Sequence, residues 1–199
     1  MRKIKHSEVK KVSKIFANIF QDYKAYDLFF AKDKNLVKKI YYFYRYEVYE
    51  DADYTYTSDD FKQVCSIRRP GDKDRNPKGM YKNPFFILAF YYWTGKRAVA
   101  LAKEYLEFCD SISDKYYVPE TDCYIKNIGV DKSLRGQGKL RAMLKEFCGD
   151  SPIVLETHLE ENVEIYQKLG FEVLEAANFH GYTHYFMKRM AKTNVEKNI

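Results

Sequence analysis

Apolar residues in the first fifty positions recur at the three- and four-residue spacing of an amphipathic helix. One such face follows Ser7, a residue type that favours helix N-caps, and a second face follows Asp33. Residues 22–31, between the two faces, lack this period and predict an irregular loop rich in aromatic side chains. The two predicted faces consist of Val9, Val12, Phe16, Ile19 and Phe20, and of Leu36, Val37, Ile40, Tyr41, Tyr44 and Val48.

The middle of the chain predicts a β-hairpin followed by a loop and two helices. Residues 53–57 and 62–68 have the alternation of strands, and Ser58-Asp59-Asp60 supplies the turn between them. Residues 69–83 contain repeated Pro and Gly and predict a loop. Residues 85–93 and 97–109 predict two helices that are separated at Gly95.

The C-terminal third alternates between strand and helix patterns. Its order is strand, helix, strand, helix, strand, strand, which predicts an α/β arrangement on a central sheet. Gly170 suits the left-handed position that ends a helix. The predicted strands are 122–130, 152–157, 171–175 and 182–189, the predicted helices are 139–148 and 161–169, and a tight turn covers 134–139.

Composition narrows the class of protein. The 199 residues are 46% hydrophobic and 31% charged, which is typical of a soluble globular chain, and we expect a single domain over residues 1–199. No apolar run is long enough to span a membrane, and the first residues lack an apolar signal region, so a cytoplasmic location without membrane partners is expected. The net charge is +6, but the Lys and Arg residues are spread along the chain and accompanied by 28 acidic residues. The charge therefore does not predict a nucleic-acid partner.

The four cysteines, Cys65, Cys109, Cys123 and Cys148, are scattered along the chain. None forms a C-x-x-C pair or has a histidine at metal-ligand spacing. We therefore expect free thiols and no metal site.

The segment from Val130 to Lys139 joins a predicted strand to a predicted helix and has the chemistry of an anion-binding turn. Gly136 and Gly138 allow unusual backbone angles and close approach of a ligand. The free N–H groups at the start of the helix attract phosphate oxygens, and Arg135 adds positive charge. The spacing fits neither a Walker loop nor a Rossmann fingerprint. A ligand-free glycine turn is the alternative interpretation.

The motifs of this region resemble the GNAT superfamily of acetyl-CoA-dependent N-acetyltransferases. In the family's turn, Q/R-x-x-G-x-G/A, Arg135 and Gly138 match, and Leu140 stands where the family has a small residue. The likeness covers about residues 122–190, and its finer pattern is similar to the puromycin N-acetyltransferase type. The matching residues are Ile128-Gly129-Val130, Arg135-Gly136-Gln137-Gly138, Leu155-Glu156-Thr157, Asn162, Tyr166 and Leu169-Gly170-Phe171.

This resemblance implies a GNAT fold: a central mixed, mostly antiparallel twisted sheet flanked by helices, with a splayed pair of parallel strands. It also implies acetyl-CoA as cosubstrate, no metal, and direct attack of a primary amine on the thioester, without an acetyl-cysteine intermediate. Tyr166 is the implied general acid, and Asn162 is implied to bond the pantetheine arm or a water. The residues implied to bind acetyl-CoA are Ile128, Gly129, Val130, Arg135, Gly136, Gln137, Gly138, Lys139, Leu140 and Asn162.

The group that removes the amine proton is less defined by the sequence. Glu156 is favoured because it lies in the matching L-E-T segment, while Glu120, Asp122 and His158 are alternatives. The amine can also lose its proton without a dedicated residue.

The acceptor is expected to be a small amine, which aromatic rings of the N-terminal half can hold by attraction to the ring faces. Ordinary packing is the other interpretation of these rings. A non-catalytic module that binds CoA or a protein partner is the alternative function, and either a monomer or a homodimer fits the sequence. The candidate rings are Tyr23, Tyr26, Phe29, Phe30, Tyr41, Tyr42 and Tyr44.

Overall fold

The structure is a computed structural model, and it describes residues 1–23, 25–30, 34–72, 88 and 91–191. Seven strands of this part form one sheet in the order β1-β2-β3-β4-β5-β7-β6. All neighbouring strands are antiparallel except β4 and β5, which are parallel. The strands are β1 Arg2–Lys3, β2 Thr55–Thr57, β3 Gln63–Arg68, β4 Cys123–Val130, β5 Ile153–Thr157, β6 Glu172–Phe179 and β7 Tyr182–Arg189.

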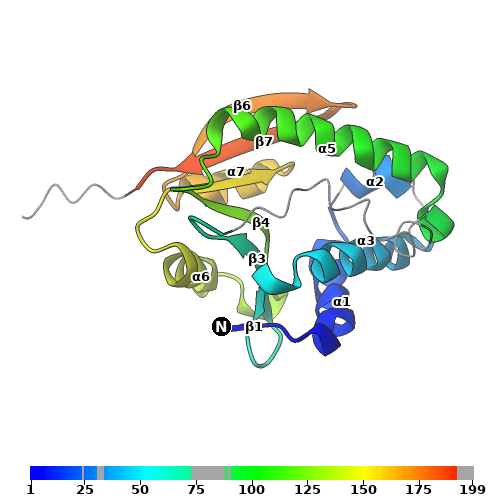
Figure 1. Cartoon of the computed structure of the whole chain (residues 1–199), viewed down its shortest axis with the longest axis horizontal. Coiled ribbons are helices and arrows are strands. Elements are labelled where there is room, and N and C mark those ends of the chain that lie inside the picture. The colour runs from blue at the N-terminus through cyan, green and yellow to red at the C-terminus, as the bar shows by residue number, and fades with distance from the viewer. Residues whose placement is uncertain (24, 31–33, 73–87, 89–90, 192–199) are drawn as a thin grey trace, which may run out of the picture.

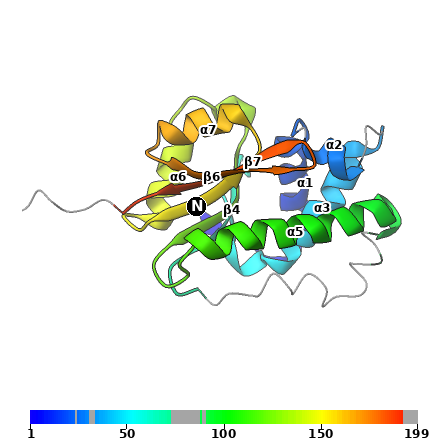
Figure 2. The same ribbon diagram turned by 90° about the horizontal axis from the view of Figure 1, so that it is seen from above.

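Helices cover both faces of this sheet (Figures 1 and 2). Helices α6 and α7 lie on one face, the long helix α5 lies on the other, and α1, α2 and α3 gather at one end of the molecule. The helices are α1 Val9–Phe20, α2 Ala25–Phe30, α3 Leu36–Glu50, α5 Lys96–Tyr116, α6 Lys139–Cys148 and α7 Glu160–Gln167, with short 3-10 turns at His6–Glu8, Ala52–Tyr54 and Lys132–Leu134.

Strand β5 lies inside the sheet between β4 and β7, and apolar side chains are buried on both of its faces. Ile153 and Leu155 pack into the core beneath α6 and α7, whereas Val154 packs with Ile112 and Phe186 beneath α5. A third core joins α1 and α3 to the sheet. The sheet therefore has a packed core on each face and a third core where α1 and α3 meet it.

The sequence patterns locate most of these elements. The hairpin β2–β3 and helix α6 are confirmed, as is the mixed, mostly antiparallel sheet flanked by helices. The predicted loop over residues 22–31 is wrong where residues 25–30 form α2, whose single turn and a half is too short to show a period. Ser7 is not the N-cap of α1, because it lies inside a 3-10 turn that precedes the helix.

Other boundaries also differ from the predictions, and β6 for example ends at Phe179 and not at residue 175. Helix α5 extends seven residues beyond the predicted end at Cys109, to Tyr116, because Ile112 continues its buried face. Strand β1 is too short for the sequence pattern to reveal. Of the predicted loop 69–83 and the predicted helix 85–93, residues 73–87, 89 and 90 lie outside the described part of the chain.

The described helices include none with the length and apolar content that a bilayer crossing requires. All four cysteines are free thiols.

Candidate active site

The parallel strands β4 and β5 separate part-way along their length. Their pairing runs from Cys123 opposite Ile153 to Ile125 opposite Leu155 and then stops. The rest of β4 continues to Val130 while paired only with β3. The splayed pair of parallel strands implied by the resemblance is therefore present. It leaves one edge of β4 open to a ligand that can form backbone hydrogen bonds.

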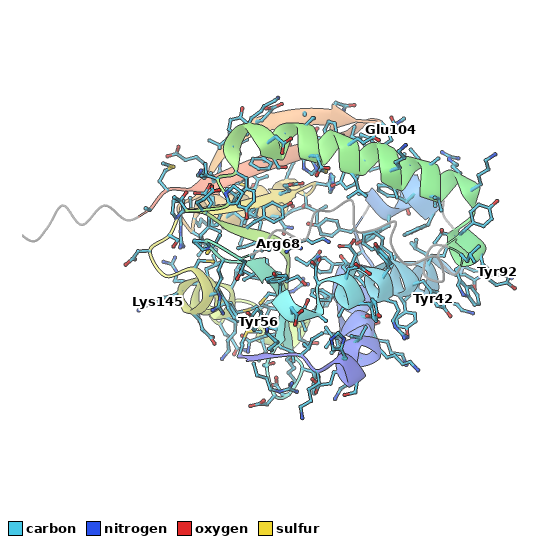
Figure 3. The ribbon with its side chains drawn as sticks, in the orientation of Figure 1. Tyr42, Tyr56, Arg68, Tyr92, Glu104 and Lys145 are labelled. Atoms are coloured by element: carbon cyan, nitrogen blue, oxygen red, sulfur yellow. The ribbon has the colours of Figure 1, made fainter. Side chains whose placement is uncertain are left out.

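A β-bulge accompanies this separation. Ser66 of β3 pairs with Asn127 and Ile67 pairs with Ile125, so Lys126 is the extra residue in β4. Its ammonium group lies 2.5 Å from Glu47 and 2.7 Å from Asp51, two buried carboxylates at the end of α3. Arg68, which lies toward the centre of the molecule in Figure 3, pairs with Asp51 at 2.6 Å. These ion pairs hold the bulged strand against α3.

The turn before α6 has the backbone geometry of an anion site. Gly136 and Gly138 adopt left-handed φ angles of +76° and +71°, which favour glycine. The first hydrogen bond of α6 runs from the N–H of Ala142 to the carbonyl of Gly138. The N–H groups of the first three helical residues therefore have no partner inside the helix and are available to an anion.

The space above this turn is open. A Cβ atom built on Gly136 or Gly138 would meet no atom within 4 Å. Leu140 instead packs against the apolar core beneath α6 and α7. The isobutyl group at position 140 thus leaves the turn accessible, and the residues present fit a diphosphate.

One cavity of about 1680 Å³ connects the turn to the gap between β4 and β5. All predicted acetyl-CoA residues except Gln137 line it, and so do Glu156 and Tyr166. The Gln137 amide donates to the Ser133 carbonyl at 3.0 Å and so braces the turn. Four cationic side chains line the cavity around the start of α6, namely Arg135, Lys139, Arg141 and Lys168.

Gly129 has a packing role at this place. A Cβ atom there would lie 3.0 Å from the Ile19 side chain, so glycine allows α1 to cross closely over β4. This contact fixes the N-terminal helices over the splayed strands.

Tyr166 lies on α7 with its ring in the core, 5.6 Å from the ring of Phe171. Burial raises the pKa of its hydroxyl, which therefore stays protonated. Within the described chain the hydroxyl makes no hydrogen bond, and the residue lines the cavity.

Asn162 occupies the first turn of α7 and joins a hydroxyl cluster. Its Nδ2 donates to the Tyr23 hydroxyl at 2.8 Å and to Thr157 Oγ1 at 3.2 Å. The oxygens of Tyr23 and Thr157 lie 3.0 Å apart. The cluster therefore ties the N-terminal aromatic segment to the end of β5 beside the splay.

Glu156 belongs to a buried polar network that the sequence does not reveal. Its carboxylate accepts from the Tyr124 hydroxyl at 2.7 Å and lies 2.8 Å from Nε2 of the fully buried His184. Nδ1 of His184 lies 3.3 Å from the Tyr105 hydroxyl, which is 2.7 Å from Nε2 of His158. All five side chains line the cavity.

The pKa values of Glu156 and His158 in this network are both lowered, for different reasons. Burial alone would raise the pKa of Glu156, but hydrogen bonds from His184 and Tyr124 outweigh it and leave the pKa below its ordinary value. Burial, with His184 beside it, lowers the pKa of His158 to about 4. The network therefore combines an ionised carboxylate with a neutral His158.

Two of the other candidate bases, Asp122 and Glu120, lie away from the cavity. Asp122 is buried and paired with Lys188 at 2.7 Å, and Glu120 is exposed before β4. Neither of them lines the cavity.

Among the described residues, the donor atoms of Cys109, Glu156 and His184 come within 4.8 Å of one another. Both Glu156 oxygens and both His184 nitrogens face polar groups of the protein. We therefore do not assign this set as a metal site.

The aromatic residues of the N-terminal half divide into two groups. Tyr41 and Tyr42 do not line the cavity, and Tyr42 stacks on Trp93 at 4.7 Å near the periphery of the molecule (Figure 3). Five of the candidate rings do line it, namely Tyr23, Tyr26, Phe29, Phe30 and Tyr44.

No protein-family model and no curated protein matches the sequence. Solved structures do match. A protein from Corynebacterium glutamicum named as histone acetyltransferase HPA2 and related acetyltransferase has 14% identity and a TM-score of 0.62 over 98% of this chain and 97% of its own. A GNAT-family acetyltransferase from Streptococcus agalactiae has 12% identity and a TM-score of 0.54 over 96% and 94%. The chain has the GNAT fold.

A third matching structure is named as an insect putative arylalkylamine N-acetyltransferase 7 from the yellow fever mosquito. It has 16% identity and a TM-score of 0.51, and it covers 94% of this chain and 84% of its own. At these identities the likeness concerns the fold. The chemistry has to be argued from the cavity.

The network around Glu156 contains the residues that sequence analysis missed. His184 occupies a strand position on the same side as the buried Phe186, where a polar residue among apolar ones is the available signal. Tyr105, Cys109 and Ile112 follow helical spacing on α5 and look like ordinary core residues.

Proposed function

We propose that the protein is an N-acetyltransferase that moves the acetyl group of acetyl-CoA to a primary amine of a small molecule. The observation that carries this proposal is the joint opening, in one cavity, of the turn before α6 and the gap between β4 and β5. The turn suits a diphosphate, and the open edge of β4 suits the amides of a pantetheine arm. Together they would place a thioester near the end of β5.

Direct attack of the amine fits the chemistry of this cavity. The amine nitrogen forms a bond to the thioester carbonyl carbon, the carbon–sulfur bond breaks, and the sulfur takes a proton. Tyr166 is the proposed proton donor, because this residue in the last turn of α7 lines the cavity and its hydroxyl is neutral.

A covalent acetyl-cysteine is not part of this proposal. Cys109 alone among the four cysteines lines the cavity. Burial and the nearby Glu156 raise its pKa well above the ordinary value, so the thiol is not ionised. Thiolate is the nucleophilic form, and a protonated thiol is a poor acetyl acceptor.

The amine is proposed to lie against the aromatic wall formed by α2 and α5. Phe29 packs edge-on against Tyr105 at 5.5 Å, and Tyr23 and Tyr26 continue the wall. Rings of this kind bind an apolar body and also attract an ammonium group.

A thiol-release assay with acetyl-CoA and a panel of amines tests the proposal. The panel contains 2-phenylethylamine, spermidine and a lysine peptide, and the acetylated product is identified by mass spectrometry. We expect amine-dependent release of CoA and an acetylated amine. Calorimetric binding of acetyl-CoA without amine-dependent release of CoA would instead support a non-catalytic CoA-binding module. Absence of acetyl-CoA binding would overturn both the acetyltransferase and the CoA-binding module.

A further inference from the structure

The buried network at the end of β5 has a vacant place for one proton. We propose that His184, held by Glu156, accepts the proton of the attacking amine, and that the Tyr105 hydroxyl passes the proton to it. This inference rests on the proposed acetyl transfer and names the base of that reaction, which the sequence left open.

The hydrogen-bond partners assign the resting tautomers. Ionised Glu156 only accepts hydrogen bonds, so His184 carries its proton on Nε2, 2.8 Å from the carboxylate. Its Nδ1 therefore presents a lone pair to Tyr105. Nδ1 of His158 is buried and makes no well-formed hydrogen bond. The backbone of Thr183 lies next to it and favours a proton on this nitrogen. Nε2 of His158 is then the acceptor for Tyr105.

The count of protons leaves one place empty. The single hydroxyl hydrogen of Tyr105 faces two ring nitrogens, at 2.7 Å on His158 and at 3.3 Å on His184. When it bonds to His158, the Nδ1 lone pair of His184 receives no hydrogen bond from Tyr105. One added proton on that nitrogen can donate to the Tyr105 oxygen.

Four side chains besides His184 face this place. They come from α5 (Tyr105 and Cys109), from β5 (Glu156) and from the turn after β5 (His158). Of the two imidazoles, only the one of His184 contacts a carboxylate, which stabilises an imidazolium ion. The low pKa of His158, about 4, keeps that ring neutral.

The proton path balances without a stable phenolate. The Tyr105 oxygen takes the ammonium proton while its own hydroxyl proton moves to Nδ1 of His184. The amine becomes neutral, Tyr105 is unchanged, and His184 becomes an imidazolium paired with Glu156. Burial raises the pKa of Tyr105 well above its ordinary value, so the residue transmits a proton but does not lose one. The imidazolium returns its proton to solvent after the product leaves.

The pH profile of kcat/KM distinguishes a base from a structural residue. Wild type, His184→Gln and Tyr105→Phe are assayed with acetyl-CoA and 2-phenylethylamine between about pH 6 and about pH 10. Without the relay, only amine that is already neutral in solution reacts, and alkylammonium groups have pKa values of about 10. We expect both variants to lose about 10²–10³-fold at neutral pH and to recover to within about tenfold near pH 10.

Two further variants complete the experiment. Glu156→Gln removes the carboxylate that stabilises the imidazolium, and we expect the acid limb of its profile to move to lower pH. His180→Gln is the matched control, because His180 is an exposed histidine outside the cavity that pairs with Glu104. It should match wild type at every pH.

An equal loss at all pH values in His184→Gln and Tyr105→Phe, or no loss, would overturn the relay while leaving acetyl transfer intact. If His184→Gln fails to fold, Tyr105→Phe and Glu156→Gln decide the question alone. A wild type that binds acetyl-CoA but acetylates none of the panel amines would contradict the proposed function, and the relay with it.

Discussion

Asn162 donates a hydrogen bond of 2.8 Å to the hydroxyl of Tyr23, a residue 139 positions earlier in the chain. This contact joins the first turn of α7 to the segment between α1 and α2. Because Thr157 at the end of β5 shares the cluster, three separate parts of the chain meet at one hydroxyl. The relationship explains how the aromatic N-terminal half is held over the splayed strands.

Tyr23→Phe should cost stability through this cluster. The substitution leaves the amide of Asn162 and the hydroxyl of Thr157 without their shared partner in a partly buried place. We expect a loss of about 1–2 kcal/mol in the free energy of unfolding, measured by urea denaturation. Tyr42→Phe is the control, since Tyr42 stacks on Trp93 through its ring, and it should change stability by less than about 0.5 kcal/mol. Equal losses in the two variants would contradict the account of the cluster.

Gly138→Ala should separate the cost of backbone strain from the loss of ligand binding. Gly138 has a φ of +71° and open space around it, so the folded chain pays about 1 kcal/mol for the left-handed alanine. A bound diphosphate would meet the new methyl group, and we expect the Kd for CoA to rise at least about tenfold.

Gly149→Ala is the control at the other end of α6, where the space is also open and a φ of +54° with a ψ of −124° is a conformation that glycine alone adopts readily. It should lose at least as much stability as Gly138→Ala and keep its affinity for CoA. Unchanged affinity in Gly138→Ala would place the phosphates elsewhere.

Tyr166→Phe tests the proton donor. The change removes one oxygen that has no hydrogen-bond partner in the described chain, so folding and CoA affinity should stay close to wild type. The rate of acetyl transfer should fall by about 10²–10⁴-fold if this hydroxyl protonates the departing sulfur. Steady-state kinetics and calorimetry measure the two effects separately. The comparison is Tyr185→Phe, which removes an exposed hydroxyl bonded to Glu160 and should leave the rate unchanged. A Tyr166→Phe variant as fast as this control would exclude the role.

Stability should fall as the pH falls below neutral, in part because of His158. Its pKa of about 4 in the folded protein lies below the ordinary value of 6.5. Between these values the unfolded chain binds a proton that the folded chain does not, so acid favours unfolding. From about pH 7 to about pH 5 the contribution is about 1–2 kcal/mol.

Urea denaturation of wild type and His158→Gln at the two pH values measures this contribution. The variant should lose much less stability on acidification than wild type does. His180→Gln, which alters an exposed histidine, should keep the wild-type dependence. Identical pH dependence in all three proteins would mean that His158 is not buried neutral.

The sequence predicts those features that depend on local pattern. Helix α6 is found within its observed bounds because Met143, Leu144 and Phe147 repeat at helical spacing and Gly149 follows the last residue. The turn before α6 is found because glycine is the residue type that its φ angles require. The predicted site residues Arg135, Gly136, Gly138 and Lys139 of this turn line one cavity.

Features that depend on long-range packing are not visible in the sequence. Lys126 enters an ion cluster because a bulge in β4 meets α3, two elements more than seventy residues apart. His184 becomes a partner of Glu156 because β7 pairs with β5, and Tyr105 reaches His184 only when α5 lies over the sheet. Their sequence neighbours are those of ordinary strand and helix positions, so neither spacing nor composition marks them.

Isothermal titration calorimetry with acetyl-CoA and with S-acetylpantetheine, which lacks the nucleotide and its diphosphate, tests the central claim most directly. If the turn at Gly136 and Gly138 binds the diphosphate, acetyl-CoA should bind at one site with a Kd of roughly 1–100 μM. S-acetylpantetheine should bind at least about 100-fold more weakly. Equal affinity for the two compounds, or no heat with acetyl-CoA, would contradict the account.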